Sequence, residues 1–416
     1  MRKIFIVLAS LLGVITSTWA AENVVSDHPV LYSGVSGPYL DASGQIETRI
    51  HWATTYGTKN KIRIYVAPDE VLIGGGAYIS EAGSTNALLR SSYPYFHGSW
   101  YDATIDDDQY YALSWCAESL DHPSGDTEMH WLTVQAVGMK LKSSIHVGSY
   151  VPQADVLKKL RYTWAASGRA AHPSATVSPI PGFDIVSGGA RVIDFAGMTT
   201  GNFANTAGNY LTESMGIYNP STNRLDGWRA SSKDHIFSCP TSIIAYAICL
   251  PKNNGWDDFP GYDYYGNYRE ASIPEFGNFN FTIRDSSNTA LVTWGWNAAR
   301  VAPSFINTTP DSNGILQLTM PYRELNNFYN DSWNPYLEQQ SGKNVVYSLV
   351  GVGAKASYNG SGRLLSSVSF NDGNYSASIQ DKDYIYWDSG TLYGQQILIV
   401  KDTGTGNWWY PGMQGN

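Results

Sequence analysis

Two Asp-His doublets are the residues best suited to do chemistry, and they stand at the same point of a motif that occurs twice. Residues 115–122 read Trp-Cys-Ala-Glu-Ser-Leu-Asp-His, and residues 228–235 read Trp-Arg-Ala-Ser-Ser-Lys-Asp-His. An adjacent carboxylate and imidazole can bind a metal or orient a base. Neighbouring residues of a strand point to opposite faces, however, and an aspartate can simply cap a turn. Structural support, ligand or metal binding and catalysis therefore all stay open for Asp121, His122, Asp234 and His235.

Aromatic segments with turn residues form a second candidate site. Residues 256–268 hold six aromatic side chains and three aspartates, and residues 93–101 are similarly rich in rings. Sugar rings present apolar C–H faces that stack on aromatic planes, and their hydroxyl groups bond to short polar side chains. The same rings could instead close the ends of β-sandwiches as small cores. The predicted ligand-binding residues are Trp256, Asp257, Asp258, Tyr262, Tyr264, Tyr265, Tyr95 and Trp100.

Familiar catalytic and cofactor motifs are missing from the sequence. There is no Gly-x-Ser-x-Gly elbow, no His-Glu-x-x-His helix, no Cys-x-x-Cys pair and no phosphate loop. Asp106 to Asp108 fits a solvated turn better than a calcium site, so we expect no cofactor, and bound calcium has no support. Cys239 and Cys249 flank one predicted strand, which would hold them too far apart for a disulfide.

The doublets belong to a longer duplicated unit. A glycine-rich marker, 73–77 and again 186–190, precedes each tryptophan by the same separation: Ala77 to Trp115 and Ala190 to Trp228 are both 38 residues. Markers kept at one separation indicate a repeat of about 52–139 and 164–250. A degraded third copy is predicted from Leu349–Ala354 and Leu364–Ser367, with Trp387 after it.

Short alternating segments between turn residues predict an all-β protein built of tandem antiparallel β-sandwich repeats with short linker helices. Residues 62–66 alternate cleanly, for example, whereas 154–160 is the best helical pattern. We divide the chain into a signal peptide (1–20), a first β repeat domain (21–150), a second (151–255), an aromatic-rich β segment (256–340) and a degenerate third repeat (341–416).

The amino-terminal residues resemble a secretory leader. Arg2 and Lys3 precede an apolar run of twelve residues, 4–15, with small residues at Thr18 and Ala20 before the expected cleavage. Loss of the leader leaves a net charge of −11, which argues against nucleic acid or an anionic membrane as partner. No segment is long enough to span a bilayer as a helix. We expect a secreted, extracellular protein, periplasmic in transit, whose oligomeric state is open.

The order Gly-Gly-Ala, Leu-x-x-Ser, Trp-x-Ala-x-Ser-x-Asp-His and Ala-Tyr-Ala-Ile resembles a tandem repeat of secreted bacterial proteins of unassigned function. The resemblance covers about 52–139 and 164–250, and the first copy departs from it with Gln-Ala-Val-Gly at Gln135–Gly138. It implies export and a tandem architecture. It carries no activity and assigns no site residue.

Three functions are compatible with these patterns. The leading hypothesis is an exported binding or adhesion protein that recognises a glycan or cell-surface ligand through aromatic loops, and that is not expected to be an enzyme. A glycan hydrolase with two unrecognised carboxylates is the second. The third is a secreted β-rich toxin or pore former, although 357–369 and 376–385 are short and irregular for membrane strands.

Overall fold

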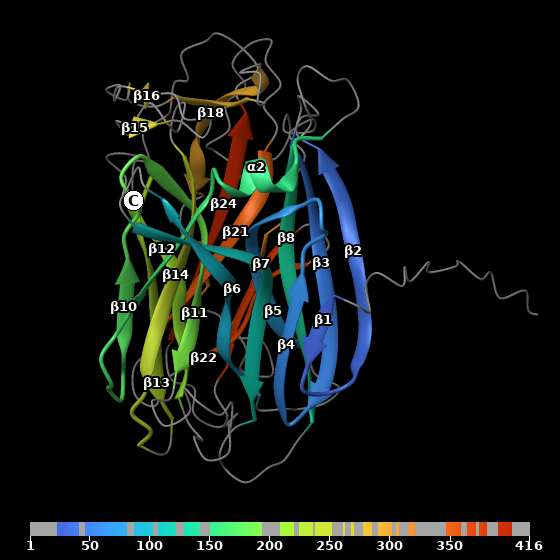
Figure 1. The fold of residues 1–416 in the computed structure, drawn as a ribbon. Helices are drawn as coiled ribbons and strands as arrows, with labels where there is room; N and C mark the ends of the chain where they lie inside the picture. Colours follow the sequence, from blue (N-terminus) through green and yellow to red (C-terminus); the bar gives the residue numbers. More distant parts are fainter. Residues whose placement is uncertain are drawn as a thin grey trace, which may run out of the picture.

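The computed structural model is an almost entirely β-stranded molecule in which long strands run side by side (Figure 1). It describes residues 23–40, 46–80, 87–102, 107–121, 129–141, 150–193, 209–219, 224–235, 238–251, 261–262, 268–269, 278–284, 290–301, 305–307, 316–320, 347–358, 364–371, 374–380 and 390–401. The short helix α2 (Gln153–Leu157) falls in the predicted linker. The all-β, antiparallel class expected from the alternating segments is confirmed.

Three large sheets make up the fold. Sheet I has the strand order β1 (Val24–Ser26), β4 (Lys59–Tyr65), β7 (Asp107–Leu120), β6 (Leu88–Asp102), β11 (Phe183–Ile193), β14 (Ser242–Pro251) and β9 (Arg161–Ala166). Sheet II has the order β2 (Val30–Leu40), β3 (Ile46–Gly57), β8 (His130–Leu141), β5 (Val71–Ser80), β22 (Leu364–Asn371), β23 (Asn374–Gln380) and β20 (Leu316–Met320).

Sheet III has the order β10 (Ser174–Val177), β13 (Arg224–Asp234), β12 (Asn209–Asn219), β21 (Tyr347–Tyr358), β24 (Gly390–Lys401), β18 (Ala290–Val301) and β17 (Asn278–Arg284). Strand β19 (Phe305–Asn307) pairs with β24, and β15 (Gly261–Tyr262) pairs with β16 (Tyr268–Arg269). No helix in these described ranges is long and apolar enough to cross a membrane.

One pattern of strand pairing recurs three times. The glycine-rich strands β5, β11 and β21 pair on one side with β8, β14 and β24, and on the other with β22, β6 and β12. Each glycine-rich strand also carries a bulge at the same place, between Leu72 and Gly74, Ile185 and Ser187, and Leu349 and Gly351. We call the strands β3 to β8 the first unit, β9 to β14 the second, and β18 with β20 to β24 the third.

The sheets do not coincide with the units. Sheet I joins β4, β7 and β6 of the first unit to β11, β14 and β9 of the second, and the other two sheets join the units in the same cyclic way (Figure 1). We call the pairings that join two units junctions; in them Ala190 faces Ser92, Ala77 faces Val368 and Ala354 faces Ser214. Each unit is a sandwich whose two layers belong to different sheets.

The glycines that the two marker segments share leave room for a tryptophan ring and for a neighbouring strand. A Cβ on Gly75 would lie 2.2 Å from the Trp115 ring, and one on Gly188 would lie 2.4 Å from the Trp228 ring. The next glycine meets the junction instead, since a Cβ on Gly189 would lie 2.5 Å from the Ser92 carbonyl oxygen. The first glycine of the Gly-Gly step therefore lets the tryptophan ring pack in the sandwich core, and the second lets the strand of the next unit approach closely.

Tyr375 takes the tryptophan position in the third unit. It pairs with Phe370 as Trp115 pairs with Pro94 and Trp228 with Gly216. Its ring lies against Gly394, and its hydroxyl donates to the Gly353 carbonyl at 2.8 Å. Trp387, which the sequence analysis placed after the third copy's markers, lies outside the described residues.

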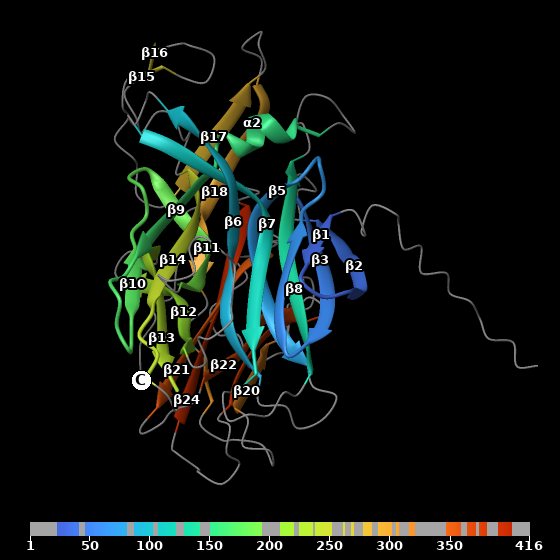
Figure 2. The same cartoon turned by 60° about the horizontal axis from the view of Figure 1, so that its bottom comes forward.

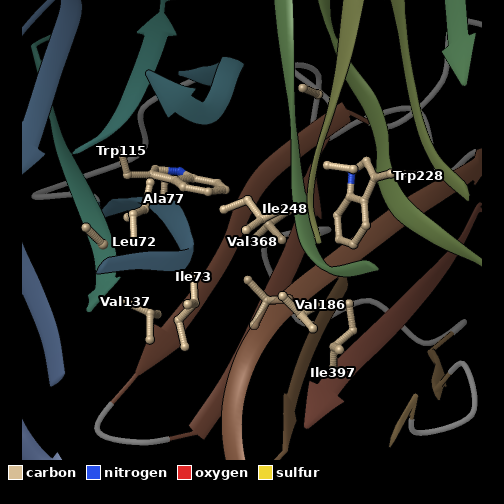
Figure 3. Close-up of a cluster of buried hydrophobic side chains, with 14 of the residues drawn as sticks. Leu72, Ile73, Ala77, Trp115, Val137, Val186, Trp228, Ile248, Val368 and Ile397 are labelled. Atoms are coloured by element: carbon tan, nitrogen blue, oxygen red, sulfur yellow. The ribbon is translucent and has the colours of Figure 1, made fainter. Parts of the chain in front are cut away.

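Equivalent side chains of the three units meet in the core. Leu88 and Tyr210 each precede the leucine of a Leu-x-x-Ser step, Leu364 precedes the equivalent Leu365, and the three form one small buried cluster with Leu120. In the main core, Figure 3 shows Ile73 and Val137 of the first unit near Val186, Ile248 and Ile397 of the other two. The packing relates the units by an approximate threefold arrangement.

Candidate functional site

The predicted 256–265 loop contributes little to the described structure. Trp256, Asp257, Asp258, Tyr264 and Tyr265 lie outside the described residues. Tyr262 lies in β15, opposite Tyr268, with only its backbone described. Binding by this loop stays a prediction.

The Asp-His doublets are largely interior. Asp121 and His235 are buried, and His122 lies outside the described residues. The Asp234 carboxylate accepts a hydrogen bond from the Cys239 backbone N–H at 3.3 Å and lies 3.2 Å from Nε2 of His172. The Asp234 contact is a turn-capping contact of the structural kind. Among the described residues, no three His, Cys, Asp or Glu side chains are grouped to hold a metal.

Tyr95 and Trp100 lie on the longest hairpin of the three units. The hairpin β6–β7 pairs from Leu88 and Leu120 out to Asp102 and Asp107, whereas its equivalents β12–β13 and β22–β23 are shorter. Two bulges, at Tyr95–Phe96 and at Phe96–Gly98, re-aim its side chains. Figure 2 shows the far ends of β6 and β7 crossing toward β9, which β7 contacts at Tyr110 and Tyr162.

Five rings and one guanidinium form a continuous row along this hairpin and the adjacent strand β4. Ring centroids lie 5.1 Å apart for Tyr65 and His97, 5.4 Å for Tyr95 and His97, 6.3 Å for His97 and Tyr111, and 6.0 Å for Tyr111 and Trp100. All of these side chains are partly exposed. We define the aromatic row as Arg63, Tyr65, Tyr95, His97, Tyr111 and Trp100.

Arg63 closes one end of the row. Its guanidinium carbon lies 4.1 Å from the centroid of the Tyr95 ring and 5.2 Å from that of Tyr65. Gly98 makes room further along, because a Cβ there would lie 2.8 Å from the Tyr111 ring. The row thus combines rings in tilted, edge-on and stacked contact with one cation that lies against two of them.

His97 at the centre of the row is a neutral imidazole. The Leu113 backbone N–H donates to Nδ1 at 3.2 Å, so Nδ1 carries no proton. Nε2 then donates to the Ser114 hydroxyl at 3.2 Å. Burial, helped by the charge of Arg63, lowers the pKa of His97 to about 4. The imidazole therefore offers a ring face and no charge at neutral pH.

A buried cluster of Tyr93, Cys116 and Tyr246 packs against Tyr95 of the row. Tyr93 stacks on Tyr246 at 5.3 Å, and the Arg191 guanidinium lies 5.0 Å from the Tyr93 ring centroid. Burial raises the pKa of the neighbouring Cys116 thiol to about 12, so this thiol is inert. Cys116, Cys239 and Cys249 form no disulfide with one another; for Cys239 and Cys249 this agrees with the separation expected from the strand between them.

At two of the three junctions, a glutamine side chain forms two hydrogen bonds to the backbone of the neighbouring unit; the third junction has no such glutamine. Gln395 accepts from the Gly216 N–H at 2.8 Å and donates to its carbonyl at 3.1 Å, and Gln135 makes the same pair of bonds to Phe370. At the junction beside the aromatic row, Pro94 takes the equivalent place and has no N–H to bond. Tyr246 replaces the glutamine there and packs on aromatic rings. The row lies at the junction where the threefold pattern breaks.

Four members of the row were missed by sequence reasoning. Arg63 and Tyr65 stand on the same face of an alternating segment, 62–66, which gave a usable signal. His97 stands in the ring-rich segment 93–101 but was not selected, and Tyr111 gave no signal, because two bulges and the β6–β7 register bring the two rings together. Neither protein-family models nor curated proteins match this chain.

The depressed pKa of His97 predicts a stability change with pH. The unfolded chain binds a proton at His97 below about pH 6.5, whereas the folded chain resists until about pH 4. The free energy of unfolding should therefore fall as the pH drops through this window, and less steeply in His97→Gln. Urea unfolding at several pH values measures both slopes, and identical slopes would contradict the assignment.

Proposed function

We propose that this protein is an exported binding protein that recognises a saccharide through the aromatic row. The observation that carries the proposal is the row itself: rings in sequence at 5.1 to 6.3 Å, partly exposed, on the longest hairpin of the three units. Such a row offers rigid aromatic contact area at low entropic cost, and its exposed ring faces suit the C–H faces of sugar rings.

Binding is favoured over hydrolysis by the chemistry of the row. Glycosidases need two carboxyl groups about 5 to 9.5 Å apart, and none of the six members is a carboxylic acid. Glu118, which is buried on the neighbouring strand, forms an ion pair with Lys61 at 3.2 Å and accepts a hydrogen bond from the Ser91 hydroxyl at 3.2 Å. The row itself therefore supports recognition and supplies no general acid.

The repeat and the export are part of the same proposal. The three sets of equivalent strands support triplication of one ancestral unit, and the leader-like segment at 1–20 supports secretion. One unit then diverged: its hairpin lengthened, Pro94 replaced a bonded residue, and rings gathered beside it. Adhesion to a glycan-bearing surface is the role that this arrangement would serve.

Trp100→Ala tests the site. It should weaken retention on a glycan array by about tenfold or more, since one stacked aromatic contact contributes about 1 to 3 kcal/mol. The melting temperature should change little, because Trp100 is partly exposed. Retention equal to that of the unmodified protein would contradict the proposal.

Trp164→Ala is the matched control. Trp164 belongs to the same sheet and is 45% exposed, but it is not a member of the row. Its removal should leave retention within about twofold of the unmodified protein. If the two variants lose retention equally, the binding surface is not the aromatic row.

A further inference from the structure

Arg63 is a cation without an anionic partner. Its guanidinium makes no ion pair or hydrogen bond with the residues that the structure describes, and its Nε is buried without a partner. In the described part of the chain, the guanidinium lies over the ring faces of Tyr65 and Tyr95. A guanidinium in such a place has lost part of its hydration, and its planar donors match a carboxylate.

The charged side chains described on the strands next to Arg63 pair with each other and leave the charge of Arg63 unbalanced. Lys61, two residues before Arg63 on β4, forms an ion pair with Glu118 of β7 at 3.2 Å, and Arg191 lies three strands further along the sheet, on β11. Asp108 is exposed nearer the tip of the hairpin. This local excess stands in a chain with a net charge of −9. It is thus a feature of this surface rather than of the protein as a whole.

We propose that the aromatic row selects a carboxylated saccharide, one carboxylate of which pairs with Arg63 while the sugar rings stack along Tyr95, Tyr111 and Trp100. The inference rests on the proposed saccharide binding and adds the class of ligand. The rings give affinity for any sugar face, and the guanidinium gives preference for the acidic one. Neutral His97 leaves Arg63 as the charge that the row itself presents.

The experiment uses acidic oligosaccharides in matched pairs. Galacturonate, glucuronate, mannuronate and sialic acid oligomers are each compared with their carboxyl-methylated counterparts, which keep the ring and lose the charge. Titration calorimetry with the protein lacking its leader gives both affinities. At least one acidic oligomer should bind about tenfold more tightly than its ester, and the difference should shrink with added salt.

Variants at Arg63 separate the two layers of the proposal. Arg63→Met should bring acid and ester to within about twofold of each other, and Arg63→Lys should keep an intermediate preference. Arg169→Met is the control, since this exposed arginine bonds the Pro240 carbonyl instead and should leave the preference intact. Melting curves establish that each variant is folded.

The outcomes distinguish the two claims. If acid and ester bind equally and Trp100→Ala weakens both, the row binds saccharides and the acidic preference is wrong. If the acidic preference survives in Arg63→Met, the carboxylate is bound elsewhere and the inference is also wrong. If no oligomer of either kind binds, both the proposed function and the inference fail.

Discussion

Replacing Trp115 by alanine is expected to lower the free energy of unfolding by about 3 to 5 kcal/mol. The side chain is 1% exposed and fills the sandwich of the first unit against Gly75. Its indole N–H donates to the Ser92 hydroxyl at 2.9 Å, a bond that alanine also removes. Trp228→Ala should cost about the same, since its indole bonds Ser214 in the same way.

Urea unfolding of the three variants Trp115→Ala, Trp228→Ala and Trp164→Ala measures this prediction. The exposed Trp164 should cost less than about 1 kcal/mol, because little apolar area is lost. A loss below about 1 kcal/mol at Trp115 would mean that the motif tryptophan does not hold the sandwich together. Unequal large losses at the two buried positions would show that the units differ in how far they relax.

Gln395→Leu is expected to lower the free energy of unfolding by about 2 to 4 kcal/mol, through the loss of two hydrogen bonds. The change leaves the buried Gly216 N–H and carbonyl without their side-chain partner, and unmade buried hydrogen bonds cost about 1 to 3 kcal/mol each. The volume of the side chain is nearly kept, so the loss reports the bonds.

Gln135→Leu repeats the test at the second stapled junction, where Phe370 is the backbone partner. Both variants should unfold at lower urea concentration with little change in the slope of the transition. If either variant is as stable as the unmodified protein, the glutamines do not hold the units together, and the contrast with the Pro94 junction loses its meaning.

The fold class followed from local pattern, but the pairing of units did not. Alternation at 62–66 correctly placed β4, and both glycine markers lie in strands, β5 and β11. Ala77 pairs with Val368, however, nearly 300 residues away. Alternation says which face a side chain takes and not which strand lies beside it, so the sharing of sheets between units was beyond the sequence argument.

The sequence predicted only part of the third unit, for a similar reason. Its Leu-x-x-Ser step and its glycine marker were found, whereas its tryptophan equivalent is Tyr375, 21 residues after Ala354 instead of 38. Both the residue type and the spacing changed, so a search for the motif could not find it. The strand pairing reveals the equivalence, because Tyr375 lies opposite Phe370 as Trp115 lies opposite Pro94 and Trp228 opposite Gly216.

The site was predicted in part. Tyr95 and Trp100 came from the density of rings, which is visible in sequence. Arg63 joins them because β4 pairs with β7 in a register that sets Arg63 opposite Cys116, which in turn faces Tyr93. Cross-strand neighbours of this kind depend on register, and the register here is interrupted by two bulges.

The most direct test of saccharide binding at the aromatic row follows the indole N–H signals of the tryptophans by NMR during titration with a bound oligosaccharide. The Trp100 signal should move with a saturating dependence on ligand concentration, and the Trp164 signal should stay in place. Assignment comes from Trp100→Ala and Trp164→Ala. Saturable binding that leaves Trp100 unmoved would contradict the account.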